Sequence, residues 1–327
     1  MNALVPQVAR AASIWEVGKP QGHVEVRTDF PTPKEFYDDY IHGGSGEFRG
    51  VGKPALFKGA ARQMPAFRLW TDEYLREQHG SVRMDQVETE KRETRTKLPH
   101  DDWTLAKFLD SYNSSEIYST SMTPKPLGKE VYLLPMINCG GYHRRFSATV
   151  LWFSSGGTRS VIHKDGSSNL HCMFAGEKKW ILWRPDEDID TRKMGWINGE
   201  TESKKNPDFK DAYGTYVGLL DVDNVDLKRF RGWGSLKWWN MTLRAGDCAF
   251  IPPAWYHFVE APPMRSISVH VWFHAGGKFD EKGCKKLESL GRSPSDFLFR
   301  LADCSFSEDE AKTSCQLPKS RLPQDEL

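Results

Sequence analysis

The stretch Ser155-Gly-Gly-Thr-Arg-Ser-Val-Ile-His-Lys-Asp165 starts with a glycine turn and continues as a β-type run that ends in a histidine and an aspartate. Side chains alternate between the two faces of a strand, so His163 and Asp165 share a face, about 6.5–7 Å apart along the backbone. An imidazole and a carboxylate so placed can occupy two adjacent corners of an octahedral metal site. With one further histidine they form the facial triad that is typical of non-heme Fe(II) sites.

The sequence contains a second histidine-x-aspartate pattern, His100-Asp101-Asp102. It follows Pro99 in a charged loop and precedes a candidate helix, so no strand fixes its geometry. We therefore expect His100 to bind no metal.

The third ligand has to come from the remaining histidines. His257 ends the run Gly246-Asp-Cys-Ala-Phe-Ile-Pro-Pro-Ala-Trp-Tyr-His257, in which a proline pair interrupts strand pairing and re-aims the chain. His171 competes with it because it lies only six residues after the carboxylate, although a lone histidine on an apolar strand is more often a core residue. His270 and His274 are further competitors, and spacing alone does not choose among the four.

The wider chain changes texture near Val131. From there on, short β-type runs alternate with glycine and proline turns, which favours a sandwich or barrel over a parallel α/β sheet. We therefore expect an N-terminal α+β region packing on the barrel (1–130), a β core (131–276) and a C-terminal helix and tail (277–327). The expected strands are 52–57, 131–134, 148–153, 160–163, 170–174, 179–183, 249–251 and 266–273, and the expected helices are 34–41, 69–78, 104–112 and 295–302.

Two polar stretches give weaker signals. Residues 87–97 have alternating charges, and we interpret them as an exposed strand or hairpin whose side chains are solvated. Residues 185–240 show no regular periodicity, so we interpret them as loop and edge structure.

Composition limits the classes of function. The 327 residues include 45 basic and 44 acidic side chains, a balance that argues against an extensive nucleic-acid surface. No apolar run has the roughly 18–20 residues that a membrane span needs. The six cysteines form no C-x-x-C pair, which argues against a structural zinc module. We favour six free, mostly buried thiols, with disulfides as the alternative and Cys304–Cys315 as the easiest pair to form.

The two ends of the chain leave the compartment open. Gln324-Asp-Glu-Leu327 resembles the retrieval signal of the endoplasmic reticulum. Residues 1–15 lack the continuous apolar core of a secretory signal. We expect the lumen of the endoplasmic reticulum if a signal peptide precedes this sequence, and the cytoplasm or nucleus otherwise.

Four motifs in order, between Trp152 and Phe273, resemble the JmjC domain within the wider cupin group of oxygenases. They are Gly156–Leu170, Gly176–Trp183 (GEKKWILW), Gly246–His257 and Ser268–Phe273 (SVHVWF). The resemblance implies a double-stranded β-helix (jelly-roll) fold, and it implies Fe(II) with 2-oxoglutarate and dioxygen as co-substrates. The lack of a Cys/His-rich reader module favours the small JmjC hydroxylases over the large chromatin demethylases.

Individual residues match positions of that family. His163, Asp165 and His257 match the iron ligands, and Lys178 matches the lysine that holds the distal carboxylate of 2-oxoglutarate. Strand parity separates Lys178 from its neighbour Lys179, which should face the other way. The resemblance also implies supporting roles near the co-substrate, namely a hydroxyl beside the lysine from Ser160 or Thr158 and polar contacts from Asn169 and His270.

The resemblance implies a dioxygenase that hydroxylates a side chain of a protein or peptide and releases succinate and carbon dioxide. One alternative is a JmjC-type N-methyl demethylase, which would release formaldehyde. Another is a catalytically silent cupin that acts as an interaction protein, although the intact ligand set argues against it. Relatives of this kind often dimerise through C-terminal helices, so a homodimer is an open expectation.

Overall fold

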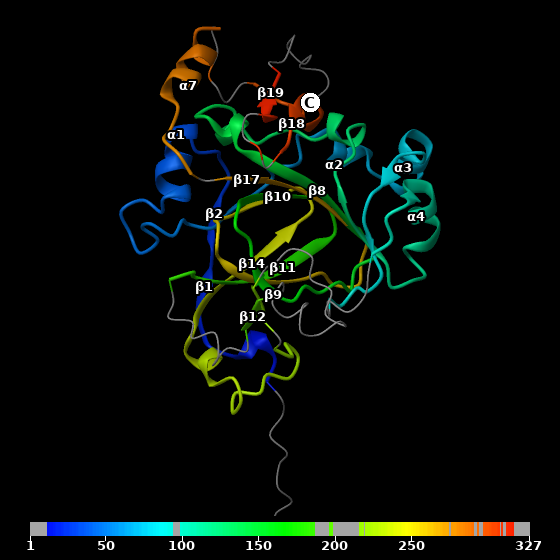
Figure 1. The fold of residues 1–327 in the computed structure, drawn as a ribbon, viewed down its shortest axis with the longest axis vertical. Coiled ribbons are helices and arrows are strands. Elements are labelled where there is room, and N and C mark those ends of the chain that lie inside the picture. The colour runs from blue at the N-terminus through cyan, green and yellow to red at the C-terminus, as the bar shows by residue number, and fades with distance from the viewer. Residues whose placement is uncertain are drawn as a thin grey trace, which may run out of the picture.

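The computed structural model describes residues 12–93, 99–186, 196–198, 216–218, 220–274, 276–290, 293, 297–307, 309 and 312–316. Within these residues the strands form one eight-stranded and one seven-stranded sheet, together with two separate strand pairs. Figure 1 shows the two large sheets one above the other, with α1 and α7 on one side of the molecule and α3 and α4 on the other. This arrangement confirms the expected mainly β jelly-roll fold.

Each large sheet has an antiparallel quartet at its centre. The eight-stranded sheet has the order β2-β3-β15-β10-β17-β8-β7-β5, and the seven-stranded sheet the order β1-β14-β11-β16-β9-β13-β12. The quartets β15-β10-β17-β8 and β14-β11-β16-β9 are antiparallel throughout and form the two walls of the barrel. The strands are β1 Lys19–His23, β2 Glu25–Arg27, β3 Ala55–Phe57, β4 Arg83–Met84, β5 Val87–Glu88, β6 Trp103–Thr104, β7 Tyr118–Met122, β8 Phe146–Ser154, β9 Ile162–Lys164, β10 Ser168–Ala175, β11 Glu177–Trp183, β12 Trp196–Asn198, β13 Tyr216–Gly218, β14 Lys237–Arg244, β15 Cys248–Ile251, β16 Tyr256–Glu260, β17 Ser266–Phe273, β18 Cys304–Ser305 and β19 Ser314–Cys315.

The helices are short and lie outside the barrel. None of them, nor any other helix in the described part of the chain, is long and apolar enough to cross a membrane. The α-helices are α1 Pro33–Glu35, α2 Pro65–Leu69, α3 Asp72–His79, α4 Leu105–Ser111 and α7 Glu281–Glu288; a π-helical turn covers Phe36–Ile41, and 3₁₀ turns cover Ile14–Glu16, Leu127–Lys129, Pro135–Ile137, Tyr142–Arg144, Arg231–Ser235 and Leu301–Asp303.

Two buried apolar layers explain why the core strands have almost continuous apolar sequences. On β10, Leu170 and Cys172 face the large cluster that the barrel shares with the N-terminal region. Met173, on the opposite face, lies between the two sheets with Trp180 and Leu182 of β11. A strand that is buried on both faces lacks polar alternation, so its pattern is a short apolar run.

The N-terminal region is built into the edges of both sheets. β2 and β3 extend the large sheet beyond β15, and β7 and β5 extend it beyond β8. β1 extends the other sheet as a parallel partner of β14. These strands pair edge groups that would otherwise be open to other chains. The domain boundary expected near residue 130 stays a prediction. One apolar cluster, from Phe36 to Leu301, contains residues from both sides of it.

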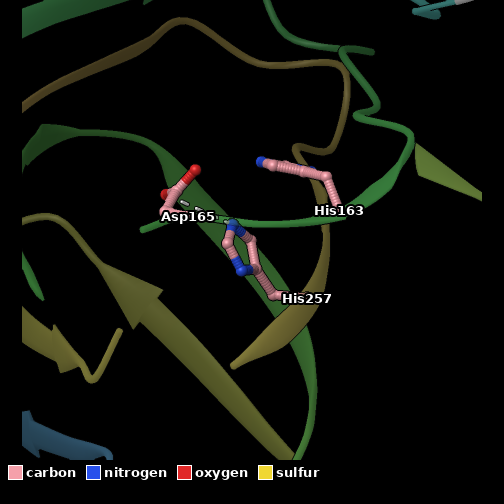
Figure 2. A group of neighbouring side chains, drawn as sticks. All are labelled: His163, Asp165 and His257. Carbon is pink, nitrogen blue, oxygen red and sulfur yellow. Dashed lines mark ion pairs between the residues drawn. The ribbon is translucent and has the colours of Figure 1, made fainter. Parts of the chain in front are cut away.

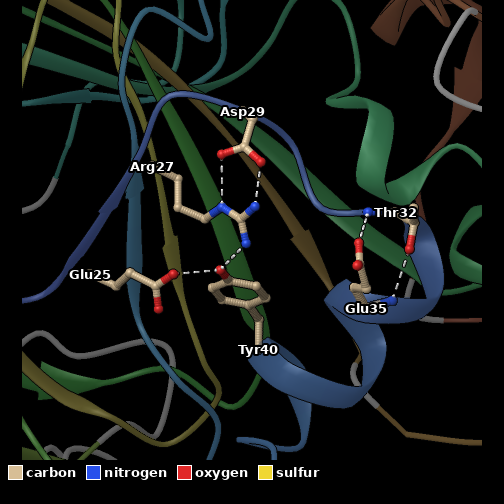
Figure 3. A network of polar contacts seen from close by, with 6 residues as sticks. All are labelled: Glu25, Arg27, Asp29, Thr32, Glu35 and Tyr40. Atoms are coloured by element: carbon tan, nitrogen blue, oxygen red, sulfur yellow. Dashed lines mark hydrogen bonds and ion pairs between the residues drawn. The ribbon is translucent and has the colours of Figure 1, made fainter.

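A polar network ties β2 to the helix that follows it (Figure 3). Thr32 Oγ1 accepts from the Glu35 amide at 3.2 Å, while Glu35 Oε2 accepts from the Thr32 amide at 2.7 Å, which is a capping box with a proline at the first helical position. The Tyr40 hydroxyl accepts from Arg27 Nη1 at 3.0 Å and donates to Glu25 Oε1 at 2.9 Å. The helix expected over 34–41 is therefore present, as α1 from Pro33 followed by the π-helical turn Phe36–Ile41.

The structure corrects three predicted elements. Residues 131–134 are buried but form no strand of the large sheets, because they pair instead with the C-terminal segment, where the Leu133 amide donates to the Phe299 carbonyl at 2.8 Å. The stretch 185–240, expected to be irregular, contains the start of β14, whose Trp238 and Trp239 are both buried. The C-terminal α-helix is α7, and within the expected helix 295–302 the described residues form only a 3₁₀ turn from Leu301.

The cysteines also differ from expectation. All six lie among the described residues, and all are paired, so the favoured interpretation of free thiols is wrong. Cys139–Cys284 joins the chain before β8 to α7. Cys172–Cys248 and the anticipated Cys304–Cys315 each connect residues that stand directly opposite each other on paired antiparallel strands. The sequence hid the first two pairs because each connects positions far apart in the chain.

Candidate metal centre and adjoining chamber

The side chains of His163, Asp165 and His257 lie close together, where β9 and β16 run side by side (Figure 2). One ligand atom from each lies within 4.8 Å of the others, and no other group of this kind occurs in the described residues. The cause is strand register, because His163 on β9 stands directly opposite His257 on β16. The two imidazole centroids are 4.2 Å apart, and His257 Nε2 is 3.8 Å from Asp165 Oδ2.

Backbone carbonyls fix which nitrogen of each histidine is free. His163 Nδ1 is 2.9 Å from the Val161 carbonyl, and His257 Nδ1 is 3.0 Å from the Trp255 carbonyl. A carbonyl can only accept, so both Nδ1 atoms carry hydrogen and both Nε2 atoms present a lone pair. Burial, reinforced by the charge of His163, lowers the pKa of His257 to about 4, against the opposing effect of Asp165. Two imidazoles that leave Nε2 for a metal, with one carboxylate, fit a divalent iron with open coordination positions.

A strained turn delivers His257 to this position. Between β15 and β16 the chain passes Pro252 and Pro253 to Ala254, which has φ of 64°, the only positive φ at a non-glycine residue in the described part. The Ala254 amide donates to the Asp165 carbonyl at 2.7 Å, so the turn is bonded to the strand end that carries the carboxylate. The indole of buried Trp255 donates to the Val51 carbonyl at 2.8 Å. The turn is therefore anchored on both sides.

The competing histidines lie elsewhere. His171 and His270 stand opposite each other on β10 and β17, on the wall that faces the metal centre, and neither belongs to the group of three. His100 pairs with Val87 through the backbone and stacks on Trp103. The amide of His274 donates to the Arg145 carbonyl at 2.9 Å.

Lys178 is a buried cation inside the barrel. It is 7% exposed whereas Lys179 is exposed, as strand parity predicts. Its Nζ lies 4.8 Å from the centre of the Trp152 ring, and among the described residues it forms no ion pair. Burial lowers the pKa of Lys178 to about 7, and the charge of Glu93 opposes the shift. A buried cation without a paired carboxylate is costly, so this position suits an anionic ligand.

Buried polar atoms without partners surround Lys178 and the metal centre. Normally about nine in ten buried polar groups have a hydrogen-bond partner. Here several on the inner faces of β10, β11 and β17 have none among the described residues, and a polar ligand would satisfy them. They are Asn169 Oδ1, both ring nitrogens of His171, Trp180 Nε1, Ser268 Oγ and His270 Nε2. We call this set of buried, unpartnered atoms, together with Lys178, the chamber.

The other expected co-substrate contacts have varied surroundings. Ser160 Oγ accepts from the Val259 amide at 3.0 Å, so this hydroxyl helps to join the segment before β9 to β16. The Thr158 carbonyl accepts from the Ala261 amide at 2.9 Å. Asn169 Nδ2 lies 3.4 Å from His270 Nδ1. Their contacts with a co-substrate stay predictions.

The charged stretch 87–97 comes near Lys178 at Glu93, whose charge acts on the lysine, while its described side chains other than Val87 stay at least partly exposed, as expected. Its described part pairs with β7 and with Arg159. Glu93 Oε1 accepts from the Tyr118 hydroxyl at 2.9 Å, and the Tyr118 ring stacks on Trp152 at 6.2 Å. The alternating pattern indicated a strand, but it gave no sign that this strand lies beside Lys178.

Comparisons with known proteins agree with this geometry. A family model described as a cupin-like domain matches residues 45–279, so the chain belongs to the cupin-like family, and its relatives identify the domain as JmjC. Lysine-specific demethylase JMJ31 of Arabidopsis thaliana is 25% identical over 268 residues, covering 68% of this chain and 46% of the relative.

Two further relatives carry different activities in their names. Lysine-specific demethylase 8 of Xenopus tropicalis is 23% identical, covering 68% of this chain and 48% of its own length. The human bifunctional peptidase and (3S)-lysyl hydroxylase JMJD7 is 21% identical, covering 74% and 81%. The chain spans about half the length of the first two relatives. The names of these three relatives specify lysine or lysyl groups, and the family normally uses Fe(II) and 2-oxoglutarate.

Proposed function

We propose that this chain is an Fe(II)- and 2-oxoglutarate-dependent dioxygenase that hydroxylates a side chain of a protein. One observation carries the proposal. Three metal-ligating side chains with fixed Nδ1–H orientation share a barrel with a buried lysine that forms no ion pair among the described residues. A metal ion alone would not need the lysine. A 2-oxo dicarboxylate would use both features, since it can chelate the metal and pair its other carboxylate with Lys178.

Each residue has a role in this proposal. His163, Asp165 and His257 hold the iron through Nε2, a carboxylate oxygen and Nε2. Lys178 pairs with the distal carboxylate of the co-substrate, and Trp152 covers one side of the ammonium group at 4.8 Å. With iron and 2-oxoglutarate bound, dioxygen would be the oxidant, giving one oxygen atom to the target and one to succinate, with release of carbon dioxide. The protein holds the ligands in place, and a wall of apolar and aromatic side chains keeps water away from the metal centre.

The names of two relatives support a second candidate, N-methyl demethylation, in which the hydroxylated carbon is a methyl group on nitrogen. The two reactions share every residue above and differ in product. Hydroxylation leaves a stable gain of one oxygen atom on the target, whereas demethylation releases formaldehyde.

The test compares wild type with Asp165→Ala. Purified protein is incubated with Fe(II), 2-oxoglutarate and a cell lysate, and succinate, formaldehyde and oxygen incorporation are measured. We expect Asp165→Ala to lower succinate formation by roughly 100-fold or more. Mutating residues that merely support a metal ligand typically costs about 10–100-fold, and loss of the ligand itself should cost more.

The chain offers a matched control in its other histidine-x-aspartate pattern. Asp102→Ala removes an exposed carboxylate and should leave succinate formation unchanged. Equal turnover in wild type and Asp165→Ala would refute the dioxygenase proposal. Formaldehyde without oxygen incorporation would favour the demethylase.

We further propose that the protein works in an oxidising compartment, with the lumen of the endoplasmic reticulum as the candidate. The support is that all six cysteines are paired, and such disulfides persist in secretory compartments but are rare in the cytosol. The test is to alkylate free thiols, isolate the protein from its own cells and analyse it by mass spectrometry. Alkylation of all six cysteines would show that this location is wrong.

A further inference from the structure

His270 receives two donors on one ring nitrogen. The Trp152 indole Nε1 lies 3.2 Å from His270 Nδ1, and the Asn169 amide Nδ2 lies 3.4 Å from the same atom. An indole nitrogen can only donate, so His270 Nδ1 has to be the acceptor. In a neutral imidazole the single proton is then on Nε2.

The ring is neutral because its surroundings oppose a second proton. His270 is 2% exposed, and burial holds its pKa well below the ordinary value, with the charge of Lys178 acting in the same direction. The lone proton therefore stays on Nε2 as long as the two donors hold Nδ1.

The Nε2–H group has no partner among the described residues. It belongs to the chamber, in which His270 faces the His171 ring at 5.5 Å, and His171 in turn meets Trp180 of the opposite sheet at 5.5 Å. Leaving a buried donor unsatisfied is unfavourable, so an acceptor oxygen at this point would bind favourably.

We propose that Trp152 is a positioning residue that holds His270 in the Nε2–H tautomer, so that a carboxylate oxygen of the co-substrate meets a fixed neutral donor. This inference rests on the proposed function, since it assigns the ligand of the chamber to the 2-oxo dicarboxylate class. Trp152 then serves the ligand twice, because its ring lies against Lys178 while its N–H orients His270.

The variant Trp152→Phe tests this directly. It keeps an aromatic ring against Lys178 and Tyr118 but removes the indole donor. Trp272→Phe is the matched control, because the Trp272 ring also contacts His270, at 4.3 Å, yet its Nε1 has no acceptor among the described residues. The full-length protein carries Zn(II) in place of iron, which keeps it diamagnetic and inactive.

Two measurements are made on each protein. In ¹⁵N spectra of the imidazoles we expect His270 to show only the Nε2–H tautomer in wild type and Trp272→Phe, and a mixture of tautomers in Trp152→Phe. By calorimetry we expect the Kd for 2-oxoglutarate to rise roughly three- to tenfold in Trp152→Phe, the equivalent of one neutral hydrogen bond. Trp272→Phe should change it less than twofold.

A rescue separates positioning from structural damage. His270→Asn supplies an amide N–H that needs no tautomer, so adding Trp152→Phe to His270→Asn should cause little further loss of 2-oxoglutarate affinity. An unchanged tautomer, or an unchanged Kd, in Trp152→Phe would overturn the inference while wild type still binds. If wild type itself fails to bind 2-oxoglutarate, the proposed function is overturned instead.

Discussion

Lys178 places a positive charge where burial opposes it, and this makes ligand binding sensitive to pH. In the free protein its pKa is about 7, below the ordinary lysine value of 10.5. A bound carboxylate favours the charged form, so binding takes up a proton above pH 7. We expect the affinity for 2-oxoglutarate to fall as pH rises through 7, by up to about tenfold per pH unit.

Calorimetric titration of the Zn(II) protein between pH 6 and 9 measures this slope. Lys178→Arg keeps its charge over the whole range and should bind with little pH dependence. Lys179→Arg, on the outer face of the same strand, should behave as wild type does. A wild-type affinity that is the same at pH 6 and pH 9 would contradict the assignment of Lys178.

At the scale of elements, the turn between β15 and β16 combines strain with function. Ala254 has φ of 64°, a conformation that costs an L-residue roughly 1–2 kcal/mol and a glycine almost nothing. We expect Ala254→Gly to leave the free energy of unfolding unchanged or to raise it by up to about 1 kcal/mol, because the relief offsets the extra entropy of the unfolded glycine. Denaturant unfolding measures the change.

Ala261 gives the control, since it is a buried alanine without a positive φ. Ala261→Gly should lower the free energy of unfolding by about 0.5–1 kcal/mol. If both glycine variants are destabilised equally, the turn at Ala254 carries no strain.

Elements with strong local patterns were predictable, and those defined by distant partners were not. The glycine-bounded apolar runs gave β8, β10, β11 and β17, and strand parity placed Lys178 inside. β14 was missed because its two adjacent buried tryptophans follow a polar stretch and show no alternation. The site shows the same division, since the spacing of His163 and Asp165 indicated a ligand pair, although Asp165 lies one residue beyond β9, whereas His257, Trp152 and Glu93 depend on contacts between distant segments.

At the scale of the whole molecule, the disulfides close loops of very different length. Cys139–Cys284 spans 145 residues, whereas Cys304–Cys315 spans 11. In the chain-entropy account a longer loop removes more freedom from the unfolded state, giving about 5 kcal/mol for the first and about 3 kcal/mol for the second. We expect the Cys139→Ser/Cys284→Ser variant to lose about 2 kcal/mol more stability than Cys304→Ser/Cys315→Ser.

Chemical denaturation of both double variants under non-reducing conditions measures this difference. The serine pairs keep similar polarity and size, so the comparison isolates the crosslink. Equal losses from the two variants would show that contacts near each disulfide, and not loop length, decide its contribution.

The pairing of β3 with β15 sets an order of events during protein synthesis. Leu56 stands opposite Ala249, a partner that the ribosome makes about 190 residues later. At roughly 5–20 residues per second, β2 and β3 wait about 10–40 s before the strand that completes their sheet exists. Through that interval the apolar Ala55–Phe57 segment, fully buried in the finished protein, has to be shielded by the nascent chain itself or by chaperones.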